Sequence, residues 1–368
     1  MREVLLRVPG MKIPLSSLWL ISAPLVYGLG HWFEAHPEAL ERYYSLSWQK
    51  IFMQGISRAT GLVPFSLAEI LFYGHLASAG VLLVLLLKSL LKGGVFRLIY
   101  KTAVYLAAVY VLFMLVWGLN YSRQPLGVTL GLDVRPYGLE ELNALSEHLL
   151  QQANALREDQ VTDQGDLMKI ASTQKDLFLR TGLGYEPLKG LHPIFDGSWG
   201  PPKLLLSSGP MLYTGITGVF MPFTGEANVN IRVPDLLLPA TAMHEKAHQM
   251  GIAREDEANY IAYVSSMNHP DSDFQYSGTV LALIHTTNAL YRESPEAYYA
   301  LREGYSEGLS RDLSAYRAFW QSYEGRINDR ADRINDTYLK SNRQQAGVKS
   351  YGRMVDLLLA QFLAGDLP

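Results

Sequence analysis

The stretch PATAMHEKAHQMGIAREDEANYIAYV, residues 239–264, decides how the C-terminal part of the chain folds, because it predicts two helices joined by a tight turn. Pro239 stands at the start of the first helix, where the missing N–H of proline has no intrahelical partner to lose. Gly251 stands at its end, where a left-handed residue commonly closes a helix. The pattern predicts helices near residues 240–250 and 255–267 with a glycine turn between them.

The first of these helices carries the pattern HExxH, in which His244 and His248 are four residues apart and therefore lie on one face. Two neutral imidazoles in this arrangement can bind one Zn²⁺ ion, which polarises a water molecule. Glu245 follows the first histidine and is the candidate general base that accepts the proton of that water. The alternative is that both histidines are polar residues of a solvated helix.

A catalytic zinc ion needs a third protein ligand. Glu255 shares a helical face with Asn259, so Glu255 can bind the metal while Asn259 hydrogen-bonds the outer nitrogen of a ligand histidine. Glu257, on a different face, is the alternative ligand. The competing interpretation of this acidic segment is a helix start that is stabilised by the helix dipole. The favoured zinc ligands are therefore His244, His248 and Glu255.

The N-terminal third has the composition of a membrane domain, residues 1–119. Three runs of 18 residues lack any charged side chain, and each is long enough to cross about 30 Å of hydrocarbon as a helix. They predict three transmembrane helices, at about residues 13–33, 66–91 and 98–119. A cleaved signal peptide is the alternative for the first run, but Pro14 and Pro24 interrupt it and no small-residue cleavage site follows.

Charge divides the chain at the same place. Up to Leu119 there are ten Lys and Arg against five Asp and Glu, whereas residues 120–368 have 22 against 30. Basic loops stay in the cytoplasm, so we expect a multi-pass protein of the cell membrane with a cytoplasmic N-terminus and an extracytoplasmic C-terminal domain. The basic residues of the second connection are Lys88, Lys92, Arg97 and Lys101. An acidic domain without a basic stripe excludes nucleic acid as the expected partner, and leaves the lipid bilayer.

The outer loop between the first two runs has apolar and aromatic residues at helical spacing. This pattern suits a helix that lies in the membrane interface, although an ordinary packed loop fits it nearly as well. The residues are Leu40, Tyr44, Trp48, Ile51 and Phe52.

The remaining fold class is mainly α, with a small β-sheet. Leucines at helical spacing from Leu139 to Leu149 predict one helix, and Leu167, Ile170 and Leu177 predict a second that stops at Gly182. Short strands are expected in KLLLSS, TGVFMPF and ANVNIRV, between residues 181 and 239. Further helices are expected near 240–250, 255–267, 277–292, 295–305, 310–341 and 351–363.

Five stretches together resemble bacterial membrane proteins of the domain of unknown function 3810 family. The resemblance implies a membrane-anchored, zincin-like domain. More distantly, HExxH followed by Glu255 and Asn259 is similar to gluzincin metallopeptidases, although the spacing from His248 is short for them. The metzincin pattern fails, because its next ligand position falls on Arg254. The five stretches are WGLNYSRQPLG (117–127), PFTGEANVN (222–230), MHEKAHQMGIAREDEANYIAY (243–263), INDTYLKSN (334–342) and GVKSYGRMVDLLLA (347–360).

The expected activity is hydrolysis of a peptide or protein substrate by a zinc metallopeptidase. Two other classes stay open: a membrane sensor or scaffold that keeps a structural zinc without cleaving, and a zinc amidohydrolase acting on a cell-wall amide. The segment 217–233 could pair with an extended substrate as an edge strand, or be a plain hairpin. Candidate oxyanion donors are Tyr338, Tyr351, Arg353 and His285, and candidate substrate-orienting residues are Glu226 and Arg232.

Overall fold

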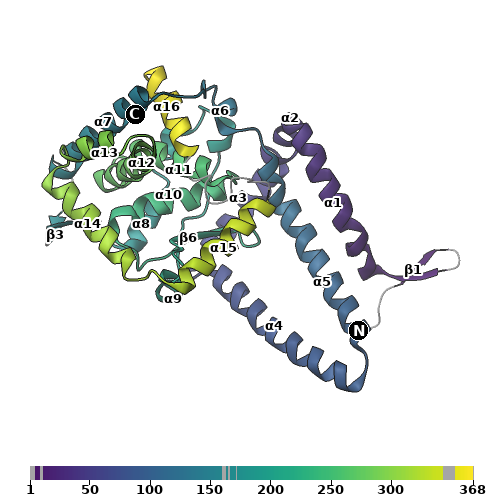
Figure 1. Cartoon of the computed structure of the whole chain (residues 1–368). Helices are drawn as coiled ribbons and strands as arrows, with labels where there is room; N and C mark the ends of the chain where they lie inside the picture. Colours follow the sequence, from purple (N-terminus) through teal and green to yellow (C-terminus); the bar gives the residue numbers. More distant parts are fainter. Residues whose placement is uncertain are drawn as a thin grey trace.

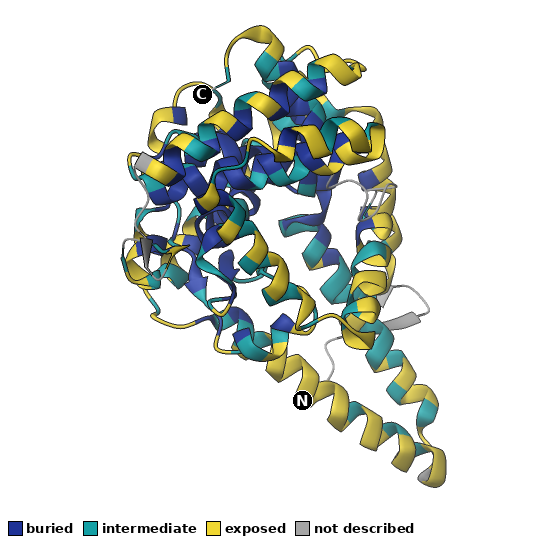
Figure 2. Cartoon of the chain, turned by 60° about the vertical axis from the view of Figure 1, so that its left-hand side comes forward, coloured by how far each residue is buried: buried dark blue, intermediate teal, exposed yellow. Residues whose placement is uncertain are grey.

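The computed structural model describes residues 5–8, 11–159, 163–164, 166–170, 172–342 and 353–367. A helical body contains most of the chain, and a pair of long helices projects from it with a third helix alongside (Figure 1). The projecting helices are largely exposed along their length, whereas the buried residues gather inside the body (Figure 2). Apolar side chains are therefore mostly exposed on the projecting helices and mostly buried in the body.

The projecting pair is a hairpin of α4 (Leu67–Lys92) and α5 (Val95–Val116). Gly93 and Gly94 join the two helices at positive φ angles of 82° and 95°, a conformation that glycine adopts without steric penalty. Both helices are long and apolar enough to cross a membrane, over Leu67–Leu91 and Val95–Val116. No residue in the most apolar window of α4 is buried, so most of the surface of its apolar side chains is not covered by the described residues.

The prediction of three transmembrane helices is wrong for the described residues, because only two helices there are long and apolar enough to cross a membrane. The first run does not become one helix: a 3-10 turn, η1 (Leu15–Ser17), precedes α1 (Leu18–Ala35), and Glu34 falls inside α1. This helix packs along α5 instead, where Val26 and Phe33 share a small apolar core with Val111 and Met114. The bond between Ser17 and Tyr100 places the start of α1 toward the hairpin tip.

The outer loop folds as α2 (Pro37–Leu40), a π-helical turn, η2 (Glu41–Ser45), and α3 (Trp48–Gly61). The apolar residues that were expected on one interfacial helix separate into two groups. Leu40 and Tyr44 are buried under α1 and α5, whereas three residues of α3 are exposed: Trp48, Ile51 and Phe52. The interfacial role of α3 stays a prediction, now for these three side chains.

The body is mainly helical, as expected. A long helix, α12, lies at its centre and packs against α7, α10 and α11 (Figure 1). Its helices of seven or more residues are α7 (Leu139–Asp159), α8 (Gln174–Arg180), α10 (Leu238–Gln249), α11 (Glu255–Met267), α12 (Ser272–Glu293), α13 (Pro295–Arg302), α14 (Glu307–Gln321), α15 (Arg326–Ser341) and α16 (Met354–Ala364).

Two predicted helices of the body differ from the observed ones. The helix expected from Leu167 begins only at Gln174, because the Thr173 hydroxyl caps α8 by accepting the N–H of Asp176, and Leu167–Met168 is a short strand, β4. The expected helix 310–341 is broken near Gly325 into α14 and α15. The spacing of apolar residues identified both helical segments, but it did not identify the residues at which the helices begin and end.

A three-stranded sheet lies beside α10, in the region where short strands were expected. Its order is β5-β7-β6, with β5 (Lys203–Leu204) parallel and β6 (Gly218–Met221) antiparallel to β7 (Glu226–Val229). Two other strand pairs are β1 (Leu5–Val8) with β2 (Met11–Pro14), and β3 (Asp163–Gln164) with β4. Strand β6 is therefore an edge strand next to the helix that carries the histidines.

Buried polar contacts fix the body to the α4–α5 hairpin. Glu226 of β7 is 2% exposed, forms an ion pair with Lys203, and accepts the backbone N–H groups of Leu67 and Ala68 at the start of α4. These are two of the N–H groups that a helix start leaves without an intrahelical partner. Glu226, a candidate for orienting substrate, thus has a structural role, because it anchors α4 to the sheet.

Candidate metal centre

The two histidines come from a helix whose ends are well defined. Helix α10 begins at Leu238 with Pro239 in its first turn, and Gly251 beyond its end has φ 94°. The N–H of Gly251 bonds the carbonyl of His248 at 2.8 Å, which closes the last turn. The chain then extends through Arg254 and re-enters helix at Glu255, so α11 starts directly opposite the end of α10.

The side chains of His244, His248 and Glu255 converge. Glu255 Oε2 lies 3.2 Å from His244 Nε2 and 3.5 Å from His248 Nε2, and ligand atoms of all three residues lie within 4.8 Å of one another. Bonds of about 2.0–2.2 Å in a tetrahedral zinc site separate ligand atoms by about 3.3–3.6 Å. The two separations from Glu255 are close to this spacing, so the three groups form a geometrically possible zinc site.

Electrostatics couples the same three groups. Burial by itself raises the pKa of Glu255, but the charges and hydrogen bonds of His248 and His244 outweigh it and hold the pKa well below its usual range. Burial lowers the pKa of His248, yet the neighbouring Glu255 carboxylate outweighs that effect and raises the pKa to about 9. The pocket between the helices therefore stabilises positive charge next to Glu255.

Glu245 lies on the opposite side of the histidines, against the sheet. Burial raises its pKa to about 7, although the neighbouring histidines act in the other direction. Its carboxylate packs on Gly218 of β6, where any side chain would collide with Oε1. Its Oε2 and the Nδ1 of His244 are buried atoms without a hydrogen-bond partner among the described residues. Two unpaired polar atoms at one centre indicate that the site receives a further polar group.

The outer nitrogens of the two histidines have different surroundings. His248 Nδ1 lies 2.7 Å from the carbonyl of Ile252, a contact that favours the tautomer in which Nε2 faces the carboxylate. Since His244 Nδ1 has no such partner among the described residues, the hydrogen bond expected from Asn259 is absent. Asn259 is buried on α11, so its position in sequence was a poor guide to its contacts.

Glu257 points away from the histidines. Its Oε1 accepts the backbone N–H of Leu126 at 2.7 Å and an Arg254 N–H at 2.8 Å. Arg254 also donates to the carbonyl of Arg123, so its guanidinium group fixes the start of α11 to the segment that follows α5. Between the two carboxylates considered as third ligand, the structure brings Glu255 to the histidines and gives Glu257 other partners.

Two tyrosines lie close to the triad. The hydroxyls of Tyr121 and Tyr338 are 3.2 Å apart, and burial together with the nearby Glu255 charge raises the pKa of both. Tyr121 was not selected from the sequence, although it lies within WGLNYSRQPLG; its proximity depends on a contact between segments 217 residues apart. Burial, and to a smaller extent the charge of His244, lowers the pKa of His285 to about 4.

The other candidate residues are not brought to the triad. Arg353 is the N-cap of α16, where burial raises the pKa of Asp356 and the Arg353 charge acts to lower it, and Arg353 forms no contact with the histidines among the described residues. Tyr351 lies outside the described residues. Arg232 lies after β7 in a separate surface pocket, together with Tyr213 and Tyr323.

The edge strand beside Glu245 presents free backbone groups. Asn230 donates its N–H to the carbonyl of Thr217 at 2.8 Å, so Thr217, Val219 and Met221 direct their polar groups toward β7. Gly218 and Phe220 alternate with them and direct theirs to the open side, where no other strand pairs with β6 among the described residues. The free edge therefore begins at the residue that packs on Glu245.

The site is a cluster of two histidines and a carboxylate, close enough together to hold one metal ion, next to a free sheet edge. Residues 44–359 match the model of a family described as a protein of unknown function (DUF3810), and the chain belongs to this family. No curated protein and no solved structure matches the chain.

Proposed function

We propose that this protein is a membrane-anchored, zinc-dependent metallopeptidase. The observation that supports the proposal best is the convergence of His244, His248 and Glu255 at the separations of a tetrahedral zinc site, with Glu245 buried beside them. Three protein ligands leave a fourth position open for water, which is the arrangement of catalytic rather than structural zinc.

Each side chain has a definite task in this proposal. His244, His248 and Glu255 hold Zn²⁺, which supplies Lewis-acid activation of a water molecule. Glu245 accepts a proton from that water as it attacks the peptide carbonyl, and then delivers the proton to the leaving amine. Burial raises the pKa of this carboxyl group, which favours the protonated form that exists between the two transfers. Burial against Gly218 keeps bulk water away from Glu245 Oε1.

The Tyr338 hydroxyl is the donor that we assign to the developing oxyanion. It is near Glu255 and bonded to the Tyr121 hydroxyl, so two phenols present O–H groups beside the triad. An extended substrate pairs its backbone with Gly218 and Phe220 of β6. This pairing sets a peptide carbonyl next to Glu245.

The α4–α5 hairpin is the membrane anchor in this proposal. Its tip carries basic residues, which favours a cytoplasmic tip and an extracytoplasmic body. The start of α1 lies toward the same tip, as Ser17 and Tyr100 show, so the N-terminus is also assigned to the cytoplasm. Since the chain has no cysteine, single-cysteine variants report this topology cleanly. An impermeant maleimide on intact cells should label Ser322→Cys in the body but not Phe96→Cys near the tip.

Hydrolysis by the full-length protein tests the activity. Wild-type protein in lipid nanodiscs with zinc should cleave a labelled unfolded protein, and Glu245→Gln should lower the rate by about 10²–10⁴-fold while keeping the metal. Glu257→Gln is the matched control, because the amide oxygen can still accept the Leu126 N–H. Bound zinc without cleavage by the wild type would favour a sensor or scaffold with structural zinc, and cleavage of a cell-wall amide alone would favour the amidohydrolase.

A further inference from the structure

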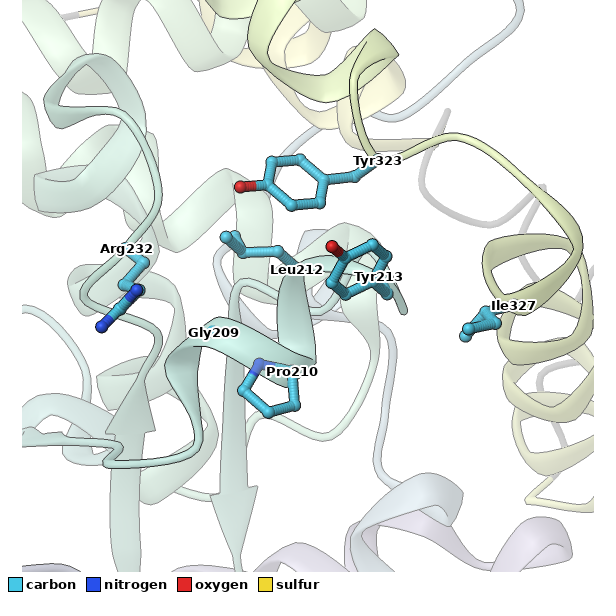
Figure 3. Close-up of a pocket in the computed structure, with 7 residues that line it drawn as sticks. All are labelled: Gly209, Pro210, Leu212, Tyr213, Arg232, Tyr323 and Ile327. Atoms are coloured by element: carbon cyan, nitrogen blue, oxygen red, sulfur yellow. The ribbon is translucent and has the colours of Figure 1, made fainter.

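A surface pocket lies at one end of the free sheet edge. It encloses about 840 Å³ between α9 (Ser208–Leu212), the segment after β7, and the connection from α14 to α15 (Figure 3). Its walls are Leu212 and Tyr213 on one side, Tyr323 and Ile327 on another, and Arg232 at the rim. This volume is within the range of pockets that hold small molecules or large side chains.

The pocket lies at the end of the edge strand. The β6–β7 pairing continues to Thr217 and Asn230, and the chain turns on both sides of this pair, so Tyr213 and Arg232 lie four and two residues beyond it. Tyr213 is five residues before Gly218, which separates them by at most about 17 Å. The α15 side of the pocket gives a similar result, because Ile327 and Tyr338 are eleven residues apart, about 16 Å along a helix. An extended substrate therefore reaches the pocket three to five residues from the bond at the metal centre.

The walls of the pocket are apolar and open to solvent. Tyr213 is 50% exposed and Ile327 is 59% exposed, and the rings of Tyr213 and Tyr323 meet edge to face at 5.2 Å. On α15, Ile327, Ile334 and Tyr338 recur at spacings of seven and four residues and lie on one face, and each is exposed. A continuous apolar wall thus runs from the pocket to the tyrosine beside Glu255.

The rim of the pocket carries a cation without a counter-ion. Arg232 is exposed, and no described residue forms an ion pair or side-chain hydrogen bond with its guanidinium group. A guanidinium group presents paired N–H donors that match a carboxylate. The rim therefore selects a negatively charged neighbour for the apolar group inside.

We infer that this pocket is the specificity site for an extended peptide substrate. It takes a large apolar or aromatic side chain three to five residues from the cleaved bond, and Arg232 binds a carboxylate next to that side chain. The inference rests on the proposed peptidase function, because it assigns the substrate class of the same cleft. The position of the pocket at the end of β6, where the free strand edge begins, is what identifies the occupant as a peptide.

Cleavage-site profiling with a random peptide library tests this inference. Full-length protein in nanodiscs with zinc should cut peptides that carry Phe, Tyr, Leu or Met three to five residues from the cut, with Asp or Glu beside it. For a matched pair of peptides with Phe or Gly at that position, Tyr323→Ala and Ile327→Arg should each lower kcat/KM for the Phe peptide by about tenfold or more, but not for the Gly peptide. Arg232→Gln should remove the preference for the acidic neighbour, again by about tenfold.

Tyr299→Ala is the control, because Tyr299 is an exposed tyrosine of α13 at a distance from the pocket. Cleavage without any preference at these positions would overturn the inference and leave the peptidase proposal standing. If no peptide is cut, anisotropy of the labelled Phe peptide decides between the two. Binding that Tyr323→Ala weakens would support the pocket and reject the peptidase, and absence of binding would reject both.

Discussion

Helices α4 and α10 differ in the kind of side chain that they expose and bury. Helix α4 is apolar on all sides, and most of its leucines and valines are exposed, from Leu85 at 46% to Leu91 at 87%. Helix α10 is short and carries charged and polar groups, yet almost all of its residues are buried. Its buried polar residues are Glu245, Lys246, His248 and Gln249.

The difference indicates the environment in which each helix is stable. An apolar helix with no protein partner is stable where lipid replaces water, because the hydrophobic effect then does not oppose exposure. Burying several titratable groups is unfavourable unless they are paired or bind a ligand. In α10, Lys246 and Gln249 donate to the carbonyls of Gly200 and Gly225, and His248 lies beside Glu255 of α11. A metal ion at the proposed site would add a partner for His248 and Glu255.

The largest effect on the folded body is expected from breaking a buried ion pair. Arg157 and Asp312 are 4% and 1% exposed and lie 2.6 Å apart, and Asp312 also accepts from Tyr276. Arg157→Met leaves the carboxylate buried without its cation and should lower the free energy of unfolding by about 3–5 kcal/mol. Chemical denaturation of the full-length protein in detergent, followed by tryptophan fluorescence, measures this change.

The matched control is the exposed pair of Arg311 and Glu307, on the surface of α14. Arg311→Met should change stability by less than about 1 kcal/mol. Equal losses of stability from the two substitutions would show that burial of the Arg157–Asp312 pair does not explain its contribution.

Truncation of a leucine compares the two environments directly. Leu283 of α12 is 1% exposed, so Leu283→Ala leaves a cavity and should lower the free energy of unfolding by about 2–5 kcal/mol. Leu83 of α4 is 58% exposed, so Leu83→Ala should change stability by no more than about 0.5 kcal/mol. The same denaturation assay measures both, and a large loss for Leu83→Ala would place a protein partner against α4.

The smallest effect is expected at Asn259. Its amide does not bond His244 Nδ1, so Asn259→Ala should leave zinc affinity within a few-fold of wild type. Loss of a group that orients a ligand histidine typically lowers metal affinity by about 10–100-fold. Competition titration with a zinc-binding dye distinguishes these outcomes, and a loss in the larger range would show that Asn259 does orient a ligand.

Local patterns in the sequence predicted the elements of the site but not all of its contacts. The spacing of His244 and His248, and the Gly251 turn, were sufficient to expect two helices facing each other, since both depend on neighbouring residues. The choice between Glu255 and Glu257 depended on the partners of each, and Arg254 with the Leu126 N–H occupies Glu257. Such partners come from distant segments and have no local signal.

Prediction of the N-terminal helices from the sequence has a similar limit. Runs without charge identified α4 and α5, because each is apolar over more than a full span. The first run was overestimated, since freedom from charge does not make residues 13–17 helical, and a 3-10 turn precedes Leu18. Tyr121 and the pocket around Tyr323 were missed for the reason that applies to most sites: each is assembled from segments that are remote in sequence.

The metal content of the full-length protein tests the central claim most directly. Protein purified without chelators should contain about one zinc ion per chain by mass spectrometry of the elements, and His248→Ala should contain almost none under the same conditions. Equal zinc in the two proteins, or no metal in the wild type, would contradict the assignment of His244, His248 and Glu255 as a metal centre.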